Sequence, residues 1–583
     1  MISLLCFIEA CGGRPDALGP LPPIASAWSL LDRAYRADPD ATEDVLAHPQ
    51  VGVWLAYTLR RLETGGDSPP SSAPLWVDVG YLHAVGVAAG ARAGLSFELA
   101  VPLRAGFAVL PTLGVAAFAD GPQLATAHAD AGHLRLVAGD LVVHARSGAA
   151  GWREPATVEA ESDGIRLVVE LVDHDAYREL QVARDPQPLS EQQIAAWREH
   201  VTRAWALLVR EHRGRAESMA VGLRTLAPSR RRKLFRPMSA SGAEAFGGIS
   251  LSEPDDAVQM AVTLVHEVQH HRLGALQHLL TLVEDVPERR FYAPWRDDPR
   301  PLNGLLQGAY AFAGITDFWC VRRRHARGAD LAIAELEQAL WWRQTLLALD
   351  ILAGSERLTG HGSKFVAILR QEVERSGADG FPDPARRSAA RLAVDHRALW
   401  RAANVRVGSG TARALADAWR RGTDAGEPLP PRLRDAHVVG NEPRFEGLDT
   451  RAVLTRLRLL RPALFDEFRA AAHRIGEHVT GALPADVALA AGETDRARAG
   501  YLEILTADPG SGRAWVGLGL TCDPGSPERR ALLGRPELVL AVAGTIGAAP
   551  ADALGLATWI GQRIVEREPA DDPAGWRIAP PAG

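Results

Sequence analysis

The sequence has few cysteines and no long apolar run. Its four cysteines, Cys6, Cys11, Cys320 and Cys522, are too few and too scattered for a disulfide framework or a four-cysteine metal site. No stretch of about 18 consecutive apolar residues occurs, so we expect no membrane-spanning helix. The short apolar start lacks a basic region and is interrupted by Glu9, which argues against a signal peptide. We therefore expect a cytoplasmic protein with reduced thiols.

Positive charge is not in excess either. Lysine and arginine number 65 against 71 aspartates and glutamates, which gives a net charge of −6. Because no basic surplus is available to hold a phosphate backbone, we expect no nucleic-acid partner. Only Lys233 and Lys364 are lysines, which we interpret as a genomic composition bias. Hydrophobic residues make up 47% and charged residues 23%, as is typical of globular proteins.

The chain is long enough for several domains, since one domain usually has about 100–200 residues. A linker rich in glycine, serine and proline at Gly65–Pro74 suggests one boundary. We predict four regions: an N-terminal helical segment (1–74), a helix with a small β domain (75–188), a metal-binding catalytic domain (189–350) and a helical C-terminal region (351–583). The expected fold class is α+β and predominantly helical, with a small antiparallel β region before the metal domain.

The spacing of apolar residues, which follows a strand period in some segments and a helix period in others, supports the four predicted regions. Short alternating runs predict strands at Ser96–Val101, Ala108–Leu113, Leu134–Val137, Leu141–His144 and Ile165–Leu171. Helical spacing predicts helices at Leu75–Gly94, Glu191–His212, Met219–Leu226, 255–285 and 303–327. The remainder of the chain, from about residue 330, is rich in alanine, leucine and arginine and is expected to be mainly helical.

The strongest chemical signal is an H-E-x-x-H motif formed by His266, Glu267 and His270 within a helical pattern. Residues four apart lie about one turn apart on one side of a helix, so both imidazoles can bind one divalent ion. Glu267 is placed to address a water on the metal or to orient a ligand. The motif is expected by chance in roughly 3% of chains of this composition. The alternative, buried structural histidines beside a surface glutamate, would leave ionisable groups on an apolar helix. The motif therefore predicts a metal site in a zincin-like helical domain.

A third ligand is not fixed by the sequence. His271 points away from the pair, and His278 lies two turns further along the helix. The next predicted helix offers Gln307, Tyr310 and Asp317, of which Tyr310 and Asp317 share a face. Asp317 would complete the two-histidine, one-carboxylate set of an oxygen-activating iron site, whereas Gln307 would be a weaker neutral ligand. Packing for Tyr310 and a surface position for Asp317 are the alternatives.

The loop between these helices supplies two cations. Arg296 and Arg300 can each bind a carboxylate through two parallel hydrogen bonds, as a keto acid or a peptide C-terminus requires. Asp297 and Asp298 would offset their charge. Two aromatic residues of the same loop would form rigid walls, namely Tyr292 and Trp295. A purely structural loop of arginine–aspartate pairs is the alternative.

The segment before the metal helix is also informative. Met238–Ser252 is expected to form a turn of small residues that leads into an edge strand. An edge strand beside a metal helix can bind an extended peptide through backbone hydrogen bonds. A flexible linker would explain the same composition.

At these residues the chain resembles the HExxH-motif peptide-modification proteins of ribosomal-peptide maturation. The matching blocks are Asp173–Arg178, Ala243–Ser252, Thr263–Leu276, Tyr292–Pro301, Gly304–Phe312 and Trp400–Asn404. The resemblance implies an iron(II)- and 2-oxoglutarate-dependent β-hydroxylase of a ribosomal precursor peptide, with His266 and His270 as metal ligands. It also implies other peptide-maturation enzymes as partners.

Three hypotheses for the function remain open. In the first, the protein is this hydroxylase, Glu267 orients a ligand, Tyr310 assists catalysis, and Arg296 and Arg300 bind 2-oxoglutarate. In the second it is a zinc peptidase in which Glu267 is the general base. In the third the site is inactive and the chain is a peptide-binding partner in a maturation complex. The 291–312 segment favours the hydroxylase.

Overall fold

The computed structural model describes residues 2–12, 14–64, 73–118, 123–229, 234–284, 287–422, 428–430, 433, 435–439, 444–547, 552–564 and 576–577. Most of the predicted linker Gly65–Pro74 lies outside these residues. The chain forms two compact units. Unit 1 comprises Met1–Arg232 and Pro237–Gly274, and unit 2 comprises Lys233–Arg236 and Ala275–Gly583. The four predicted regions stay a prediction.

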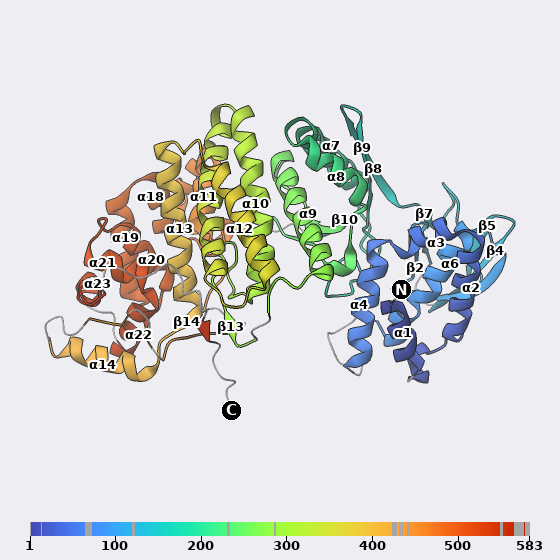
Figure 1. The fold of residues 1–583 in the computed structure, drawn as a ribbon, viewed down its shortest axis with the longest axis horizontal. Coiled ribbons are helices and arrows are strands. Elements are labelled where there is room, and N and C mark those ends of the chain that lie inside the picture. The colour runs from blue at the N-terminus through green and yellow to red at the C-terminus, as the bar shows by residue number, and fades with distance from the viewer. Residues whose placement is uncertain are drawn as a thin grey trace. The chain divides into compact units, whose positions relative to one another are not determined.

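Unit 1 begins with helices and continues into three sheets (Figure 1). Its helices are α1 (Ile2–Gly12), η1 (Pro15–Leu18), α2 (Ile24–Ala37), α3 (Pro39–Leu46), α4 (Pro49–Glu63), α5 (Leu75–Val79), α6 (Tyr81–Arg92), α7 (Glu191–Glu211), α8 (Arg213–Gly222), η2 (Ala243–Ala245) and α9 (Ala257–Leu279), whose last five residues belong to unit 2. Its strands are β1 (Phe97–Pro102), β2 (Phe107–Leu110), β3 (Gly114–Ala117), β4 (Leu124–Asp130), β5 (His133–Ala138), β6 (Leu141–His144), β7 (Trp152–Arg153), β8 (Ala156–Ser162), β9 (Ile165–Leu171), β10 (Thr225–Ser229), β11 (Ser239–Ala240) and β12 (Gly248–Ser252).

Two of these sheets are antiparallel throughout. One has the strand order β1-β4-β5-β6 and the other has the order β2-β3-β7. The predicted small antiparallel region near the N-terminus is therefore confirmed. The predicted helix Leu75–Gly94 is divided at Gly80 into α5 and α6.

The third sheet is mixed and has the order β11-β12-β10-β9-β8. Strands β9, β10 and β12 run parallel, while β8 and β11 are antiparallel edge strands. In β9 the side chains alternate between buried and more exposed positions, which follows the apolar–polar alternation of Ile165–Leu171. Helices α7 and α8 pack against β8 and β9. This sheet carries the strands that precede α9.

Two details of the third sheet differ from the sequence predictions. The predicted helix Met219–Leu226 ends at Gly222, and Leu226 lies fully buried in β10. A short apolar run does not distinguish a buried strand from a helix, which explains the error. The strand expected at the edge, β12, lies one position inside the sheet, because the two-residue strand β11 pairs with it.

Unit 2 is almost entirely helical (Figure 1). Its helices are α10 (Leu302–His325), α11 (Gly328–Ala353), α12 (Gly360–Ser376), α13 (Asp383–Asn404), α14 (Ser409–Arg420), α15 (Thr450–Leu460), α16 (Pro462–Ala470), η3 (Ala472–Arg474), α17 (Ile475–His478), α18 (Pro484–Ala491), α19 (Thr494–Ala507), α20 (Gly512–Leu520), α21 (Pro527–Arg529), η4 (Arg530–Gly534), α22 (Pro536–Ile546) and α23 (Ala553–Gly561). Two short pairs, β13 (Arg289–Arg290) with β16 (Trp576–Arg577) and β14 (Val405–Arg406) with β15 (His437–Val438), complete it.

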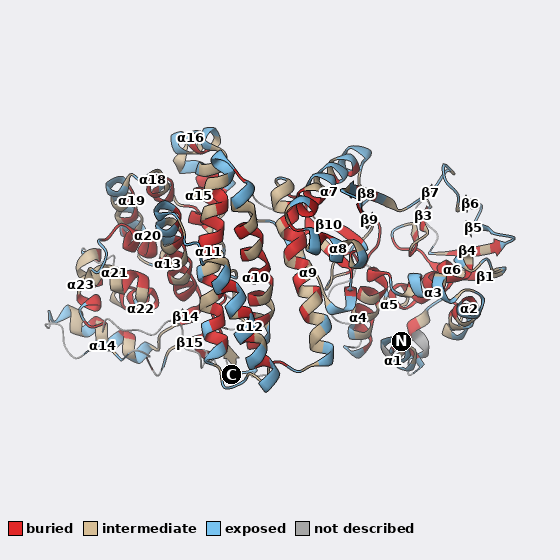
Figure 2. Ribbon diagram, turned by 45° about the horizontal axis from the view of Figure 1, so that its top comes forward, coloured by how far each residue is buried: buried red, intermediate tan, exposed pale blue. Residues whose placement is uncertain are grey.

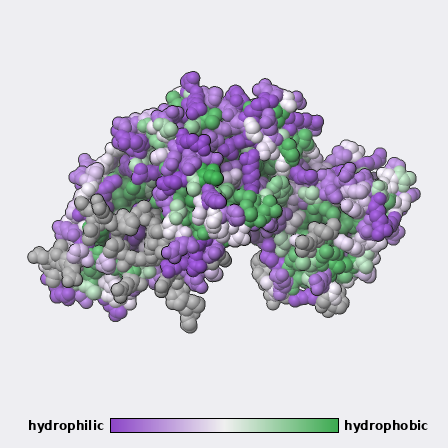
Figure 3. Space-filling model, viewed as in Figure 1, coloured by the Kyte–Doolittle hydropathy of each residue, from purple (hydrophilic) through white to green (hydrophobic). Residues whose placement is uncertain are grey.

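The long helices of unit 2 bury apolar faces against one another. Figure 2 shows buried residues along α10 and α11, which pack together. The α+β, mainly helical fold class is thus confirmed. On the face shown in Figure 3, hydrophobic residues form scattered groups among hydrophilic ones. Among the described residues, no helix is long and apolar enough to cross a membrane.

A buried ionic network stabilises unit 1. The fully buried carboxylate of Asp78 on α5 accepts hydrogen bonds from Arg61, from Arg104 Nη1 (2.8 Å) and from the hydroxyl of Tyr177 (2.6 Å). The neighbouring carboxylate of Asp175 accepts one from the hydroxyl of Tyr81 (2.6 Å). Segments that are distant in the sequence are thereby tied to each other around the core of unit 1.

We predict that Asp78→Ala destabilises the protein by about 3–5 kcal/mol, because it removes the carboxylate that pairs with the buried guanidinium group of Arg61 and leaves Arg104 with only its more distant partner, Asp185. Urea unfolding followed by circular dichroism measures the change. Asp32→Ala is the control, since Asp32 makes an exposed ion pair with Arg36 and its loss should cost no more than about 0.5 kcal/mol. Equal unfolding midpoints for the two variants would contradict the prediction.

Candidate functional site

Helix α9 carries the H-E-x-x-H motif in the part that belongs to unit 1. The helix has 23 residues without proline, and its apolar side, which includes Met260, Leu264 and Val265, is buried. His266 and His270 lie at its partly exposed side, whereas Glu267 is only 1% exposed. The helix therefore presents both imidazoles together and buries the carboxylate that lies between them in the sequence.

The two imidazoles converge. The Nε2 atoms of His266 and His270 lie 3.1 Å apart, and the ring centroids are 4.7 Å apart. At the metal–nitrogen bond lengths of about 2.0–2.1 Å that are usual for zinc, one ion would reach both nitrogen atoms. The donor pair therefore fits one divalent ion, and its geometry suits zinc and iron alike.

The protonation state of His266 also suits a metal ligand. Burial lowers the pKa of His266 to about 4, although the nearby charge of Glu267 opposes this effect. His270 lowers the pKa of His266 further. At neutral pH the His266 imidazole is therefore uncharged, which is the form that binds metals.

The carboxylate of Glu267 is held from strand β11. Its Oε1 accepts a hydrogen bond from the Ser239 hydroxyl (2.6 Å), and its Oε2 accepts one from the Ser241 hydroxyl (2.5 Å). Oε1 also lies 3.8 Å from Nε2 of His266. The carboxylate is thus oriented next to the imidazole pair by two hydroxyl groups.

The sequence did not single out either serine. They stand two residues apart in Met238–Ser252, for which the sequence predicted a turn of small residues that leads into an edge strand. This spacing places two side chains on one face only where the backbone is extended. That spacing does not indicate which helix the face meets. The contact depends on the packing of the sheet against α9, which no local pattern indicates.

The two other histidines of α9 lie elsewhere. The His271 ring is buried and contacts the ring of Phe246, with centroids 5.4 Å apart. His278 is exposed near the end of the helix. Both positions agree with the expectation that neither joins His266 and His270.

The predicted third ligands lie on α10 and belong to unit 2, whereas the histidine pair belongs to unit 1. Gln307 Nε2 donates a hydrogen bond to Gln277 Oε1 (2.5 Å). The Tyr310 ring contacts the Phe365 ring at 5.5 Å, and Asp317 is partly buried. Among the described residues, no group of three or more histidines, cysteines, aspartates or glutamates is arranged to hold a metal ion. The third ligand stays a prediction.

Both loop arginines bind the same aspartate. Arg296 Nε donates to one carboxylate oxygen of Asp298 (2.9 Å), and Arg300 Nη1 donates to the other (3.1 Å). Burial tends to raise the pKa of Asp298, but the two arginines outweigh it and hold the pKa below its ordinary value. Arg296 is 53% exposed and Arg300 34%, so solvent still reaches both guanidinium groups.

Asp297 has a different role from the one expected. Its carboxylate accepts hydrogen bonds from the backbone N–H groups of Gly447 and, at 3.2 Å, Leu448. The backbone carbonyl of Asp297 accepts a hydrogen bond from Asn404 Nδ2 (2.8 Å). Asp297 therefore fixes the loop to other parts of unit 2, and Asp298 alone offsets the arginine charge within this group.

The two aromatic residues of the loop also differ from each other. Trp295 stacks on Phe312 of α10, with ring centroids 4.6 Å apart, and lies over Gly308. Tyr292, which was expected to form a wall, is buried in the core of unit 2, and its hydroxyl lies 2.9 Å from His396 Nδ1. The sequence does not distinguish an aromatic residue that lines a loop from one that anchors the loop in a core.

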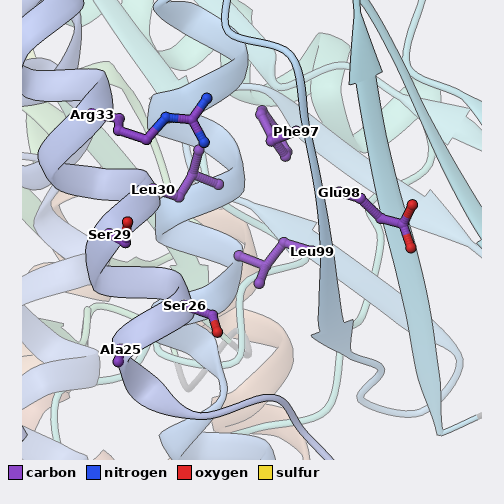
Figure 4. A pocket seen from close by; sticks show the side chains of 8 residues that line it. All are labelled: Ala25, Ser26, Ser29, Leu30, Arg33, Phe97, Glu98 and Leu99. Atoms are coloured by element: carbon purple, nitrogen blue, oxygen red, sulfur yellow. The ribbon is translucent and has the colours of Figure 1, made fainter.

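A cavity of about 400 Å³ lies between α2 and β1 in unit 1. In Figure 4, Phe97 and Leu99 point toward α2, whereas Glu98 points away from it. The alternation follows from the extended backbone of β1. None of the predicted site residues lines this cavity.

No protein-family model matches the chain, and no curated protein matches its sequence. The geometry of the residues is therefore the basis for assigning a function.

We predict that His266→Ala and His270→Ala each weaken binding of a divalent ion by more than about 100-fold, because each removes one of two converging nitrogen donors. Calorimetry with zinc and with anaerobic iron(II) measures the affinity. His278→Ala is the matched control on the same helix and should bind the ion as the wild type does. Unchanged binding by both site variants would refute the metal site.

We also predict that Gly308→Ala destabilises the protein by about 1–3 kcal/mol through overpacking. An added Cβ would lie 2.3 Å from Trp295 Nε1, so the indole has to leave its stacked position on Phe312. Urea unfolding tests the change. Gly410→Ala on α14 is the control, since no atom lies within 4 Å of its added Cβ and alanine favours a helix. A Gly308→Ala midpoint at or above that of the wild type would contradict this account.

Proposed function

We propose that the protein is a metal-dependent enzyme that modifies a ribosomally made precursor peptide. The proposed reaction is iron(II)- and 2-oxoglutarate-dependent hydroxylation of a side-chain β-carbon. The observation that carries the proposal is the convergence of His266 Nε2 and His270 Nε2 at 3.1 Å, beside an oriented carboxylate. A buried carboxylate such as that of Glu267 is costly unless hydrogen bonds or charges compensate its burial, and such groups are frequent at functional sites.

The surrounding architecture supports a zincin-like metal domain. Helix α9 follows a mixed five-stranded sheet whose edge strand β11 is antiparallel to its neighbour β12. The Ser239 side chain of that edge strand and the Ser241 side chain just after it contact the glutamate of the motif. An extended peptide can add to such an edge through backbone hydrogen bonds, which suits a precursor peptide as substrate.

The proposed roles of the residues follow from their chemistry. His266 and His270 bind the metal, and a third ligand comes from α10. Arg296 and Arg300 bind the carboxylates of 2-oxoglutarate, which would replace Asp298 as their partner. Bound iron(II) supplies the oxidising chemistry, in which 2-oxoglutarate and O₂ are converted to succinate, CO₂ and one oxygen atom for the peptide.

The remaining roles concern the groups around the metal. Asp317 is the proposed third ligand, with Gln307 as the weaker neutral alternative. Glu267 orients groups at the metal, and Tyr310 is the proposed auxiliary catalytic residue.

A zinc peptidase is the second candidate, and one observation favours it. Glu267 Oε1 lies 3.8 Å from His266 Nε2, which is close enough for the carboxylate to accept a proton from a water held beside the pair. Zinc would supply the Lewis acidity that such a reaction needs. The substrate would again be an extended peptide along β11.

The cellular setting is part of the same proposal. We place the protein in the cytoplasm, where precursor peptides are made, together with other peptide-maturation enzymes. A chain with a net charge of −6 supports the proposed absence of a nucleic-acid partner.

We predict that protein loaded anaerobically with iron(II) adds one oxygen atom to a precursor peptide encoded by a neighbouring gene, when 2-oxoglutarate and air are supplied. Intact peptide mass and succinate formation measure the reaction. Omission of either iron or the keto acid is the control and should abolish both signals. Cleavage of the peptide by zinc-loaded protein, independent of 2-oxoglutarate, would instead establish the peptidase.

Two kinds of substitution separate these reactions further. Arg296→Ala or Arg300→Ala should raise the 2-oxoglutarate concentration needed for half-maximal rate in a hydroxylase, by about tenfold for loss of a charged hydrogen bond. The same variants should leave a peptidase unaffected. Glu267→Gln should abolish hydrolysis but leave partial hydroxylation. Binding of the peptide without any change in its mass would favour an inactive binding partner.

A further inference from the structure

We infer that Ser239 and Ser241 are positioning residues, which hold the Glu267 carboxylate in the orientation that the metal site requires. The inference rests on the proposed function, because it takes the His266–His270 pair as the metal-binding centre. It adds a role for two side chains that lie outside the H-E-x-x-H motif and reach it from another element of unit 1.

The backbone of β11 and the residue after it bring both hydroxyls to one side. Ser239 and Ser241 are two residues apart, so in an extended segment their side chains share a face while Ala240 between them faces the opposite way. Each hydroxyl binds a different oxygen of the same carboxylate, at 2.6 and 2.5 Å. Two donors on two oxygens fix the plane of the carboxylate as well as its position.

The strand itself is anchored firmly to the sheet. Ser239 pairs with Leu251, and Ala240 pairs with Ser250, in the antiparallel register of β11 and β12. The backbone N–H of Ser252 donates to the carbonyl of Met238 (2.7 Å), and the Ser252 hydroxyl accepts from the Met238 N–H (2.9 Å). The serine hydroxyls therefore have a fixed base from which to hold Glu267.

The two serine hydrogen bonds leave the Glu267 carboxylate able to accept further hydrogen bonds. An ionised carboxylate has about four lone-pair sites, and the two serines use one on each oxygen. Oε1 is also the oxygen 3.8 Å from His266 Nε2, so its remaining site lies beside the imidazole pair. Without the serines, a glutamate side chain on α9 could rotate about its own bonds, and the oriented arrangement would be lost.

Simple satisfaction of a buried carboxylate is the competing explanation, since such a group needs hydrogen bonds wherever it lies. The two explanations differ in what removal of the serines changes. A purely structural role predicts lower stability with an unaltered metal centre and unaltered turnover of folded protein. A positioning role predicts an altered metal centre and slower turnover in protein that is still folded.

The test uses the full-length protein loaded with cobalt(II), whose visible absorption depends on the surroundings of the ion. The variants are Ser239→Ala, Ser241→Ala, the double alanine variant, Glu267→Gln and the conservative Ser241→Thr. Ser250→Ala is the matched control, because Ser250 lies in the neighbouring strand and pairs with Ala240. Cobalt affinity, kcat and KM are measured alongside, with whichever peptide reaction the wild type performs.

We expect the double alanine variant to reproduce the cobalt spectrum of Glu267→Gln and to retain cobalt affinity within about tenfold. Its kcat should fall about 10- to 100-fold while KM changes less than about twofold, as for lost stabilisation confined to the transition state. Ser241→Thr should restore most of the spectrum and rate lost in Ser241→Ala, because it keeps a hydroxyl. Ser250→Ala should match the wild type throughout.

Different results would refute the positioning role and the proposed function. If wild-type protein binds no cobalt, or binds it independently of His266 and His270, the proposed function is wrong. If it binds cobalt through this pair but folded serine variants keep the wild-type spectrum and kcat, the positioning role is wrong. Should the double variant not fold, the single variants decide in the same way, and a wild-type spectrum in both overturns the inference.

Discussion

The burial of the Glu267 carboxylate is the constraint on which the candidate site depends. A charge that is 1% exposed costs several kcal/mol unless hydrogen bonds replace its water. Ser239 and Ser241 supply those bonds, so strand β11 has to lie against α9. Strand β11 in turn exists only as a partner of β12, which precedes α9 in the chain. The helix, the sheet edge and the orientation of the Glu267 carboxylate therefore depend on one another.

The sequence predicted local features of this arrangement well. The spacing of His266 and His270 predicted that the imidazoles share a side of the helix, and their nitrogen atoms do converge. Alternation of polar and apolar residues predicted strand β9 with the bounds that it has, Ile165–Leu171, because only one face of that strand is buried. The α+β, mainly helical class follows from the same two periods.

Features that depend on packing between distant segments were not predicted. Leu226 lies in a central strand whose neighbours β9 and β12 are both parallel to it, so its environment is apolar and carries no alternation. The role of Asp297 depends on backbone groups about 150 residues away. The serine pair depends on the side of the sheet that faces α9. None of these contacts leaves a periodic trace in the sequence near the residues that make it.

The loop that follows α9 is anchored in unit 2, and it also keeps two arginine side chains accessible to solvent. Asp297 and Tyr292 tie it into unit 2 through the backbone near Gly447 and through His396, while two arginines stay partly exposed on Asp298. The Asp173–Arg178 block is similar in its supporting role, since its aspartate and tyrosine side chains belong to the buried network of unit 1. The loop and the Asp173–Arg178 block therefore include structural supports as well as candidate binding groups.

The order of strands in the mixed sheet has a consequence for protein synthesis. Strand β10 is central, yet its partner β12 is made after it, and the segment between them includes residues 233–236, which belong to unit 2. Parallel pairing of this kind requires the closure of a chain loop before any contact is gained. Until Gly248–Ser252 is available to pair, the edge of β10 that β12 will cover has backbone N–H and C=O groups without a strand partner. An incomplete chain that ends before β12 therefore has an unpaired strand edge, which is a feature that favours aggregation.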